Sequence, residues 1–283
     1  MENEKKINWF PGHMAKAMRK TEEDVKLCDG VIYVLDARAP YASVNQKLMK
    51  IFGNKPVVYA LNKVDAISLD AAKKIVSDFR SKGLNIEPIN GLLKKDAEKL
   101  KAACGRAVKE KAERNKNKGI NKTFRFMVAG IPNTGKSTII NTMSGKKKAE
   151  TGDKAGITRS NKWIRLGDIE LLDTPGTMPP SMENQRYAEH LAFIGAINDD
   201  ILDLEGLTLK LIAELKEIAP AEFKEKYKLD DLTSEPLSIF EAVCKKRGYI
   251  LKGGDADYGR CARAIIADLR KGRIGKICFE VEA

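Results

Sequence analysis

A glycine-rich octapeptide, Gly130–Ser137 (GIPNTGKS), matches the G-x-x-x-x-G-K-[ST] pattern of phosphate-binding loops. It follows the apolar run 124–129 and precedes an apolar helical pattern, which is the strand–loop–helix context that such a loop needs. There, backbone N–H groups converge on a phosphate at a helix N-terminus, where the dipole favours negative charge. Lys136 would reach the β- and γ-phosphates, and the Ser137 hydroxyl would bind Mg²⁺. The loop therefore predicts a nucleoside triphosphate site.

A second motif, Asp173–Gly176 (DTPG), has the residues for the other half of a magnesium site. Asp173 ends an apolar run and would hold Mg²⁺ through water, while the Gly176 N–H would contact the γ-phosphate. Thr158 lies between the two motifs, where a switch threonine would close over Mg²⁺ only when the γ-phosphate is present. The predicted magnesium ligands are therefore Ser137, Thr158 and Asp173.

A third motif, Asn62–Asp65 (NKVD), reads as the Asn-Lys-x-Asp that selects guanine. The Asp65 carboxylate can accept hydrogen bonds from guanine N1–H and from the exocyclic amine, and adenine offers neither donor there. Such sites also contain a loop that touches guanine O6, and Asn90 and Gly91 match it poorly. These two residues would contact O6 through their backbone N–H groups. In an ordinary GTPase the phosphate loop precedes Asn-Lys-x-Asp. The inverted order predicts a circularly permuted, guanine-specific domain.

These motifs define the predicted site for GTP and GDP. The nucleotide-binding residues are Asn62, Lys63, Asp65, Asn90, Gly91, Asn133, Thr134, Gly135, Lys136, Ser137, Thr138, Asp173 and Gly176. The predicted catalytic residues are Lys136, Thr158, Gly176 and His13.

The elements that must position these residues alternate between strands and helices. Apolar, β-rich runs predict strands at 31–35, 56–61, 85–89, 124–129, 162–166 and 169–172, the last two forming a hairpin. Helical periodicity separates them at 43–52, 68–82, 96–116, 136–145 and 184–198. The alternation predicts a doubly wound, mainly parallel α/β sheet, with the site residues just after strand ends, where ligands bind in such sheets.

Strand signals stop near residue 200. Apolar periodicity at 207–218, 237–244 and 261–269, interrupted by Pro220, Pro236 and Gly253-Gly254, predicts a small all-α domain. The predicted organisation is an N-terminal segment (1–24) that packs on a permuted G domain (25–198), followed by a helical RNA-binding domain (199–283). In the last domain, Ile265, Ile266 and Leu269 are predicted core residues.

The charge of the chain is strongly basic, at +12 with a sequence pI near 9.3. Residues 94–122 carry eleven Lys or Arg against four acids, and residues 245–276 carry ten against three. Such blocks favour an anionic partner, although any single block is also compatible with a solvated surface or linker. The phosphate contacts predicted in the second block are Lys245, Lys246, Arg247, Lys252, Arg260, Arg263, Arg270, Lys271, Arg273 and Lys276.

Cysteine use and hydropathy indicate the compartment. The five cysteines are far apart and form no C-x-x-C pair, which favours reduced thiols over a disulfide framework or a zinc site. No run approaches the ~20 apolar residues of a membrane span, and the N-terminus lacks the features of a signal or transit peptide. A cytoplasmic protein is expected.

The motifs in this permuted order, together with Trp9–Met14 (WFPGHM), Asp36–Pro40 (DARAP) and Arg270–Lys276 (RKGRIGK), closely resemble the ribosome biogenesis GTPase A family over essentially the whole chain. The resemblance implies a GTPase that binds ribosomal RNA of an immature large (50S) subunit and couples GTP hydrolysis to late assembly and release. It implies no DNA and no membrane as partner. Nothing in the sequence demands a dimer, so a monomer is expected off the ribosome.

The group that orients the attacking water is left open. Thr177 stands where many GTPases carry a glutamine. His13 is one candidate, although Trp9–Gly12 would equally serve as an anchor to the domain or to RNA. Asn133 matches the residue that ligates K⁺ in related potassium-activated GTPases, and K⁺ would spread the transition-state charge. The alternative is that Asn133 only tolerates the conformation of the loop. The ribosome, acting in trans, is the third candidate.

Two rival functions remain at this stage. One is a GTPase of similar build that serves another cargo, such as tRNA. The other is a GTP-sensing RNA-binding factor in which hydrolysis is incidental, which the missing glutamine keeps open. Hydrolysis measured with and without large-subunit particles separates these readings.

Overall fold

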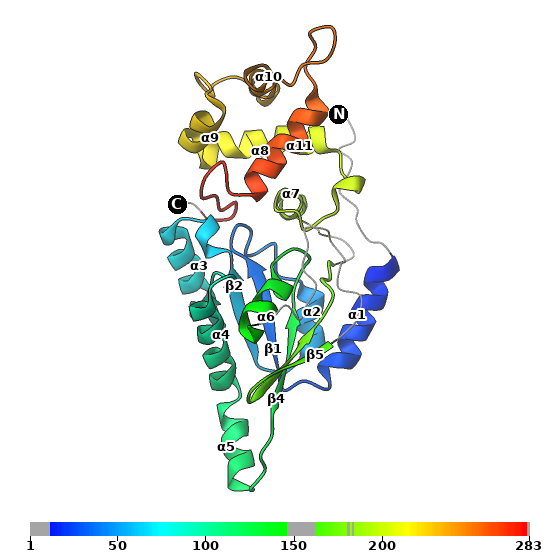
Figure 1. The fold of residues 1–283 in the computed structure, drawn as a ribbon, viewed down its shortest axis with the longest axis vertical. Coiled ribbons are helices and arrows are strands. Elements are labelled where there is room, and N and C mark those ends of the chain that lie inside the picture. Colours follow the sequence, from blue (N-terminus) through cyan, green and yellow to red (C-terminus); the bar gives the residue numbers. More distant parts are fainter. Residues whose placement is uncertain (1–11, 146–161, 180–181, 183, 282–283) are drawn as a thin grey trace.

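The computed structural model describes residues 12–145, 162–179, 182 and 184–281 (Figure 1). It places an α/β unit in the middle, a helical unit at one end of the long axis, and a projecting helix at the other end. The strands of the α/β unit are β1 Gly30–Asp36, β2 Val57–Asn62, β3 Asn85–Pro88, β4 Phe124–Ala129, β5 Lys162–Leu166 and β6 Ile169–Asp173. Its helices are α1 Gly12–Val25, α2 Gln46–Phe52, α3 Leu69–Ser81, α4 Lys94–Ala107, α5 Lys109–Asn117 and α6 Lys136–Ser144.

The strands form one sheet in the order β3-β2-β1-β4-β6-β5. All neighbouring pairs are parallel except the β5–β6 hairpin, which turns at Gly167, where φ is +71°. The order grows outward from β1 in one direction and from β4 in the other, so the crevice of the doubly wound sheet lies beyond the C-terminal ends of β1 and β4. The predicted fold class, strands and hairpin are confirmed.

Both faces of the sheet are covered, because side chains alternate along each strand. Val31, Tyr33 and Leu35 of β1 pack with α1, α2 and α3. Ile32 and Val34 of the same strand pack with α4 and α6. Burial on both faces explains why β1 is apolar throughout rather than alternating.

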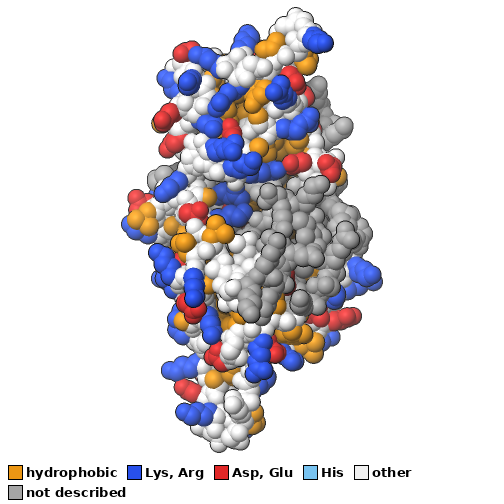
Figure 2. Space-filling view, viewed as in Figure 1, with side chains coloured by type: hydrophobic (Ala, Val, Ile, Leu, Met, Phe, Trp, Pro, Cys, Tyr) orange, Lys and Arg blue, Asp and Glu red, His pale blue; other side chains and the backbone are white. Residues whose placement is uncertain are grey.

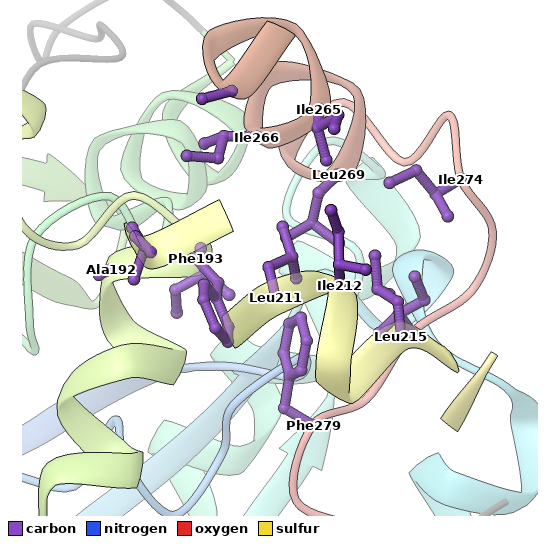
Figure 3. Close-up of a cluster of buried hydrophobic side chains, with 14 of the residues drawn as sticks. Ala192, Phe193, Leu211, Ile212, Leu215, Ile265, Ile266, Leu269, Ile274 and Phe279 are labelled. Atoms are coloured by element: carbon purple, nitrogen blue, oxygen red, sulfur yellow. The ribbon is translucent and has the colours of Figure 1, made fainter. Parts of the chain in front are cut away.

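The helical unit comprises α7 Gln185–Phe193, α8 Leu204–Ile218, α9 Pro220–Tyr227, α10 Pro236–Arg247 and α11 Tyr258–Arg270. Figure 3 shows its core, in which Leu211, Ile212 and Leu215 of α8 face Ile265 and Leu269 of α11. The predicted core residues Ile265, Ile266 and Leu269 are all buried. The boundary predicted between residues 198 and 199 stays a prediction, and the side chains of α7 lie in this same core.

Three of the helical predictions differ from the structure. The helix expected over 184–198 ends at Phe193, as α7. The helix expected over 96–116 is two helices, because Val108 leaves helical geometry with φ −111° and ψ 11°. Pro220, expected only to interrupt a helix, instead begins α9. Proline fits the first helical position because the N–H it lacks has no intrahelical partner there.

Two further features concern the helices and the cysteines of the described residues. Within the described ranges, none of the helices is long and apolar enough to cross a membrane. All five cysteine thiols are free, and four of them are buried.

Candidate nucleotide site

The phosphate loop joins β4 to α6 at the sheet crevice. Gly130 has φ +144°, and a Cβ there would lie 2.5 Å from the Val34 carbonyl oxygen of β1. Gly135 has φ +91° and caps the N-terminus of α6, so its N–H end faces the crevice. Asn133 has φ +60°, which asparagine tolerates better than most residues. The strand–loop–helix context predicted for this octapeptide is present.

Lys136 points back into the loop that precedes it. Its ammonium donates to the Ile131 carbonyl oxygen at 2.7 Å, and the residue is buried. Burial lowers the pKa of Lys136 to about 8, against the opposing influence of Asp173. A buried ammonium that, among the described residues, has a carbonyl and a nearby carboxylate as partners would gain from an anionic ligand.

The side chains of Ser137 and Asp173 contact each other near Lys136. The Ser137 hydroxyl donates to Asp173 Oδ2 at 3.4 Å, and Asp173 Oδ1 is buried without a hydrogen-bond partner among the described residues. Burial raises the pKa of Asp173, although Lys136 opposes it. A hydroxyl beside an unsatisfied buried carboxylate oxygen is the hard oxygen donor set that Mg²⁺ prefers, so the two predicted ligands fit the ion. The third, Thr158, lies outside the described residues.

The segment after β6 packs against the phosphate loop. The Thr174 hydroxyl donates to the Val128 carbonyl, and the Thr177 N–H donates to the Gly130 carbonyl at 3.2 Å. A Cβ at Gly176 would lie 2.7 Å from Pro132 Cα and 2.9 Å from Lys136 Nζ. Only glycine permits this close approach to the phosphate loop, and the contact of its N–H with a γ-phosphate stays a prediction.

Asn62 ties the base-recognition loop to the phosphate loop. Its amide nitrogen donates to the Thr134 carbonyl at 2.8 Å, and its amide oxygen accepts from the Gly91 N–H at 2.8 Å. The Lys63 ammonium donates to the Asn133 carbonyl at 2.7 Å. Three segments that are far apart in the chain are thereby held together at one edge of the sheet.

Asp65 lies exposed at the mouth of a cavity of about 540 Å³. Asn90, Gly91 and Thr138 line the same cavity, so the weak guanine-loop match lies where the base interpretation needs it. The volume is within the range of ligand pockets in proteins. The part of the predicted guanine site that the structure describes is therefore one contiguous cavity.

His13 and a K⁺ bound by Asn133 are two of the three open candidates for the group that drives hydrolysis. His13 lies in the first turn of α1, but its side chain is outside what the structure describes. The Asn133 side-chain amide donates to the Gly195 carbonyl, just beyond α7. Asn133 therefore has a structural contact in addition to its unusual φ, and its role toward K⁺ stays a prediction.

Motif reasoning missed the cluster that supports Lys63. The buried Asp36 carboxylate accepts from Arg38 Nε at 2.9 Å and Nη2 at 2.8 Å, and from Lys63 Nζ at 2.8 Å. Burial alone would raise the pKa of Asp36, but Arg38 and Lys63 hold it well below its ordinary range. The Asp36–Pro40 run, noted above only as a family signature, was the available signal. Asp36 thus fixes the position of Lys63.

The comparisons with known proteins agree with this geometry. Residues 125–229 match a family model described as a 50S ribosome-binding GTPase. Ribosome biogenesis GTPase A of Bacillus cereus is 39% identical, over 97% of this chain and 93% of its own length. Two solved structures of YlqF, one GDP-bound and one GNP-bound (from T. maritima), superpose with TM-scores of 0.64 and 0.63 at 25% and 26% identity. They cover 93% and 94% of this chain, and 98% and 97% of their own chains. The chain belongs to the ribosome biogenesis GTPase A family, and it is a GTP hydrolase with a P-loop G domain.

Proposed function

We propose that this GTPase binds ribosomal RNA of the immature large (50S) subunit and couples GTP hydrolysis to late assembly and to its own release. The observation that carries the proposal is the basic surface of the helical unit, which lies directly beside the nucleotide cavity. Figure 2 shows Lys and Arg side chains spread over this end of the molecule. The description of the matching family model, which names 50S binding, supports the same partner.

On this surface, two arginine guanidinium groups lie over aromatic rings. Arg247 lies 5.2 Å from the ring centroid of Tyr227, and Arg260 lies 5.1 Å from that of Tyr249. Both arginines are exposed, so they can contact phosphates while the rings hold them in place. Such contacts favour salt-dependent binding to RNA shape rather than to base sequence.

Arg270 does not belong to this surface, although it was predicted as a phosphate contact. Its guanidinium pairs with Asp199 at 2.7 and 2.8 Å and donates to the carbonyls of Phe193 and Ala192. With its donors committed inside the molecule, Arg270 joins α11 to the end of α7.

The mode of action follows from the permutation. The Asp173–Gly176 segment leads through α7 into the helical unit, so ordering of this segment by a γ-phosphate would reorient the RNA-binding surface. The protein would then hold the subunit precursor in its GTP form and leave it after hydrolysis. We propose that it acts in the cytoplasm, as a monomer off the ribosome, without contact to DNA or membranes.

Co-sedimentation tests the proposal. The chain should sediment with large-subunit precursors in the presence of a non-hydrolysable GTP analogue and remain in the supernatant with GDP. Addition of these particles should also raise a low basal GTPase rate many-fold, since Thr177 stands where many GTPases carry the glutamine that orients water. Equal sedimentation with both nucleotides, or no stimulation, would contradict the coupling.

Potassium is proposed as an additional activator through Asn133, a residue of the phosphate loop. GTP turnover should be several-fold faster in KCl than in NaCl, because a bound K⁺ would offset charge on the transferring phosphoryl group. Asn133→Gly is the informative variant, since glycine keeps the φ of +60° and removes only the side chain. The variant should retain nucleotide binding and lose the difference between the salts. Equal wild-type rates in the two salts would refute this role.

A further inference from the structure

The C-terminal segment returns from the helical unit to the α/β unit, and we call residues 271–280 the C-terminal strap (Figure 1). The Ile277 N–H donates to the Ala66 carbonyl at 3.0 Å, and the Phe279 N–H donates to the Arg38 carbonyl at 2.8 Å. Glu280 accepts from the Tyr41 N–H at 2.6 Å. Ala66 directly follows Asp65, so the strap is hydrogen-bonded to the loop that carries the predicted base-selecting carboxylate.

The same strap is part of the helical core. Ile274, Ile277 and Phe279 are each less than 5% exposed and belong to the cluster that α8 and α11 form. Figure 3 shows Ile274 beside these helices and Phe279 below Leu211 and Ile212. A displacement of the strap from the base loop would therefore disturb packing in the helical unit.

The strap also lines the nucleotide cavity. Together with Asp65 and Thr138, its lining includes the strap residues Lys271, Gly272, Gly275 and Lys276. Lys276 additionally borders the groove beside Asp65, on the side of the predicted base. Lys271 borders a second cavity of about 650 Å³ that includes the phosphate-loop residue Asn133. Both lysines therefore border the predicted nucleotide site, with Lys276 also near Asp65 and Lys271 also near Asn133.

The cationic side chains around the cavity differ in whether they are paired with a carboxylate. Its cationic residues are Arg38, Lys63, Arg270, Lys271 and Lys276. Asp36 pairs with the first two, and Asp199 pairs with Arg270. Lys271 and Lys276 are exposed, and within the described part of the chain the structure records no hydrogen bond or ion pair for the side chain of either. These two ammonium groups remain available to a ligand that carries negative charge or acceptor atoms.

We propose that Lys276 and Lys271 complete the nucleotide site, with Lys276 beside the guanine base and Lys271 beside the ribose and phosphates. Guanine presents O6 and N7 as acceptors to such an ammonium. Occupancy of the base pocket then holds the strap, and with it the helical unit, on the G domain. The inference rests on the proposed site, since it takes the cavity of Asp65 as the guanine pocket. It differs from coupling through Asp173–Gly176, because the base is common to GDP and GTP.

Nucleotide affinity of the full-length chain tests the contacts. In titrations with a fluorescent GDP, Lys276→Ala and Lys271→Ala should each weaken binding by about tenfold, the loss of one charge-assisted contact. Lys276→Arg should restore most of it. Lys245→Ala is the matched control, because Lys245 is exposed on α10 and lines neither cavity. Unchanged affinity in both strap variants, or an equal loss in the control, would overturn the proposal; failure of the wild-type chain to bind GDP would instead overturn the nucleotide site itself.

Hydrogen exchange tests the coupling, at the amides of Ile277 and Phe279. GDP and a non-hydrolysable GTP analogue should slow exchange in residues 274–281 to the same degree, by about tenfold or more, since both stabilise the bound strap. Magnesium tripolyphosphate, which lacks a base and can reach only Lys271, should slow exchange much less than GDP. In Lys276→Ala, protection at saturating GDP should be smaller than in the wild type. Protection by the GTP analogue alone, or protection by tripolyphosphate equal to that by GDP, would overturn the inference.

Discussion

Asp65→Asn should lower the affinity for GTP by about a thousandfold and create affinity for xanthosine triphosphate. The carboxylate would accept two charge-assisted hydrogen bonds from guanine, and each such bond contributes about 1.5–3 kcal/mol. An asparagine amide offers one acceptor and one donor. That pair complements xanthine, whose C2 carries a carbonyl oxygen in place of the amine. Competition of GTP and xanthosine triphosphate against a fluorescent nucleotide measures both effects.

Asp70→Asn is the matched control for this exchange. Asp70 lies in the first turn of α3, five residues away, with a side chain that is 73% exposed and does not line the cavity. It should bind GTP like the wild type. If Asp65→Asn lost GTP without gaining the xanthine nucleotide, the carboxylate would support the loop rather than read the base.

The site residues that could be predicted from the sequence are those that belong to a short sequence motif. Gly130–Ser137 and Asn62–Asp65 each combine a strand end with a turn, and both lie where that local pattern requires. The spacing of residues within each motif is enough to predict its loop, because the glycines and polar residues of the motif itself set the loop conformation. The inverted order of the two motifs likewise follows the order of the strands that carry them.

The contacts that join distant segments could not be predicted in this way. Arg38 donates to the Arg270 carbonyl across 232 positions, and Glu280 accepts from Tyr41 across 239. Such pairings depend on how two packed units close against each other, which no local periodicity encodes. The misassigned Arg270 has the same origin, since its acidic partner Asp199 lies 71 positions away.

His190 occupies one of these distant contacts and carries the largest expected effect on stability. The ring is only 2% exposed and lies between two carboxylates, with Nδ1 3.1 Å from Glu280 and Nε2 3.2 Å from Glu214. Burial would lower the pKa of His190, but the hydrogen bonds to Glu214 and Glu280 raise it to about 9. The protonated ring therefore joins α7, α8 and the C-terminal strap in one buried ionic cluster.

His190→Ala should lower the free energy of unfolding by about 3 kcal/mol near pH 6, because it leaves two carboxylates without their shared partner. The folded-state pKa lies above the unfolded value of 6.5, so the stabilisation is complete below pH 6.5 and is lost as the pH rises through about 9. Urea unfolding of the wild type and the variant at pH 6 and pH 9.5 measures this. Lys210→Ala, which removes an exposed ion pair with Glu189, is the control and should change stability by less than about 1 kcal/mol. A difference between wild type and His190→Ala that stayed constant across this range would show that the ring acts by packing against Phe279 rather than by its charge.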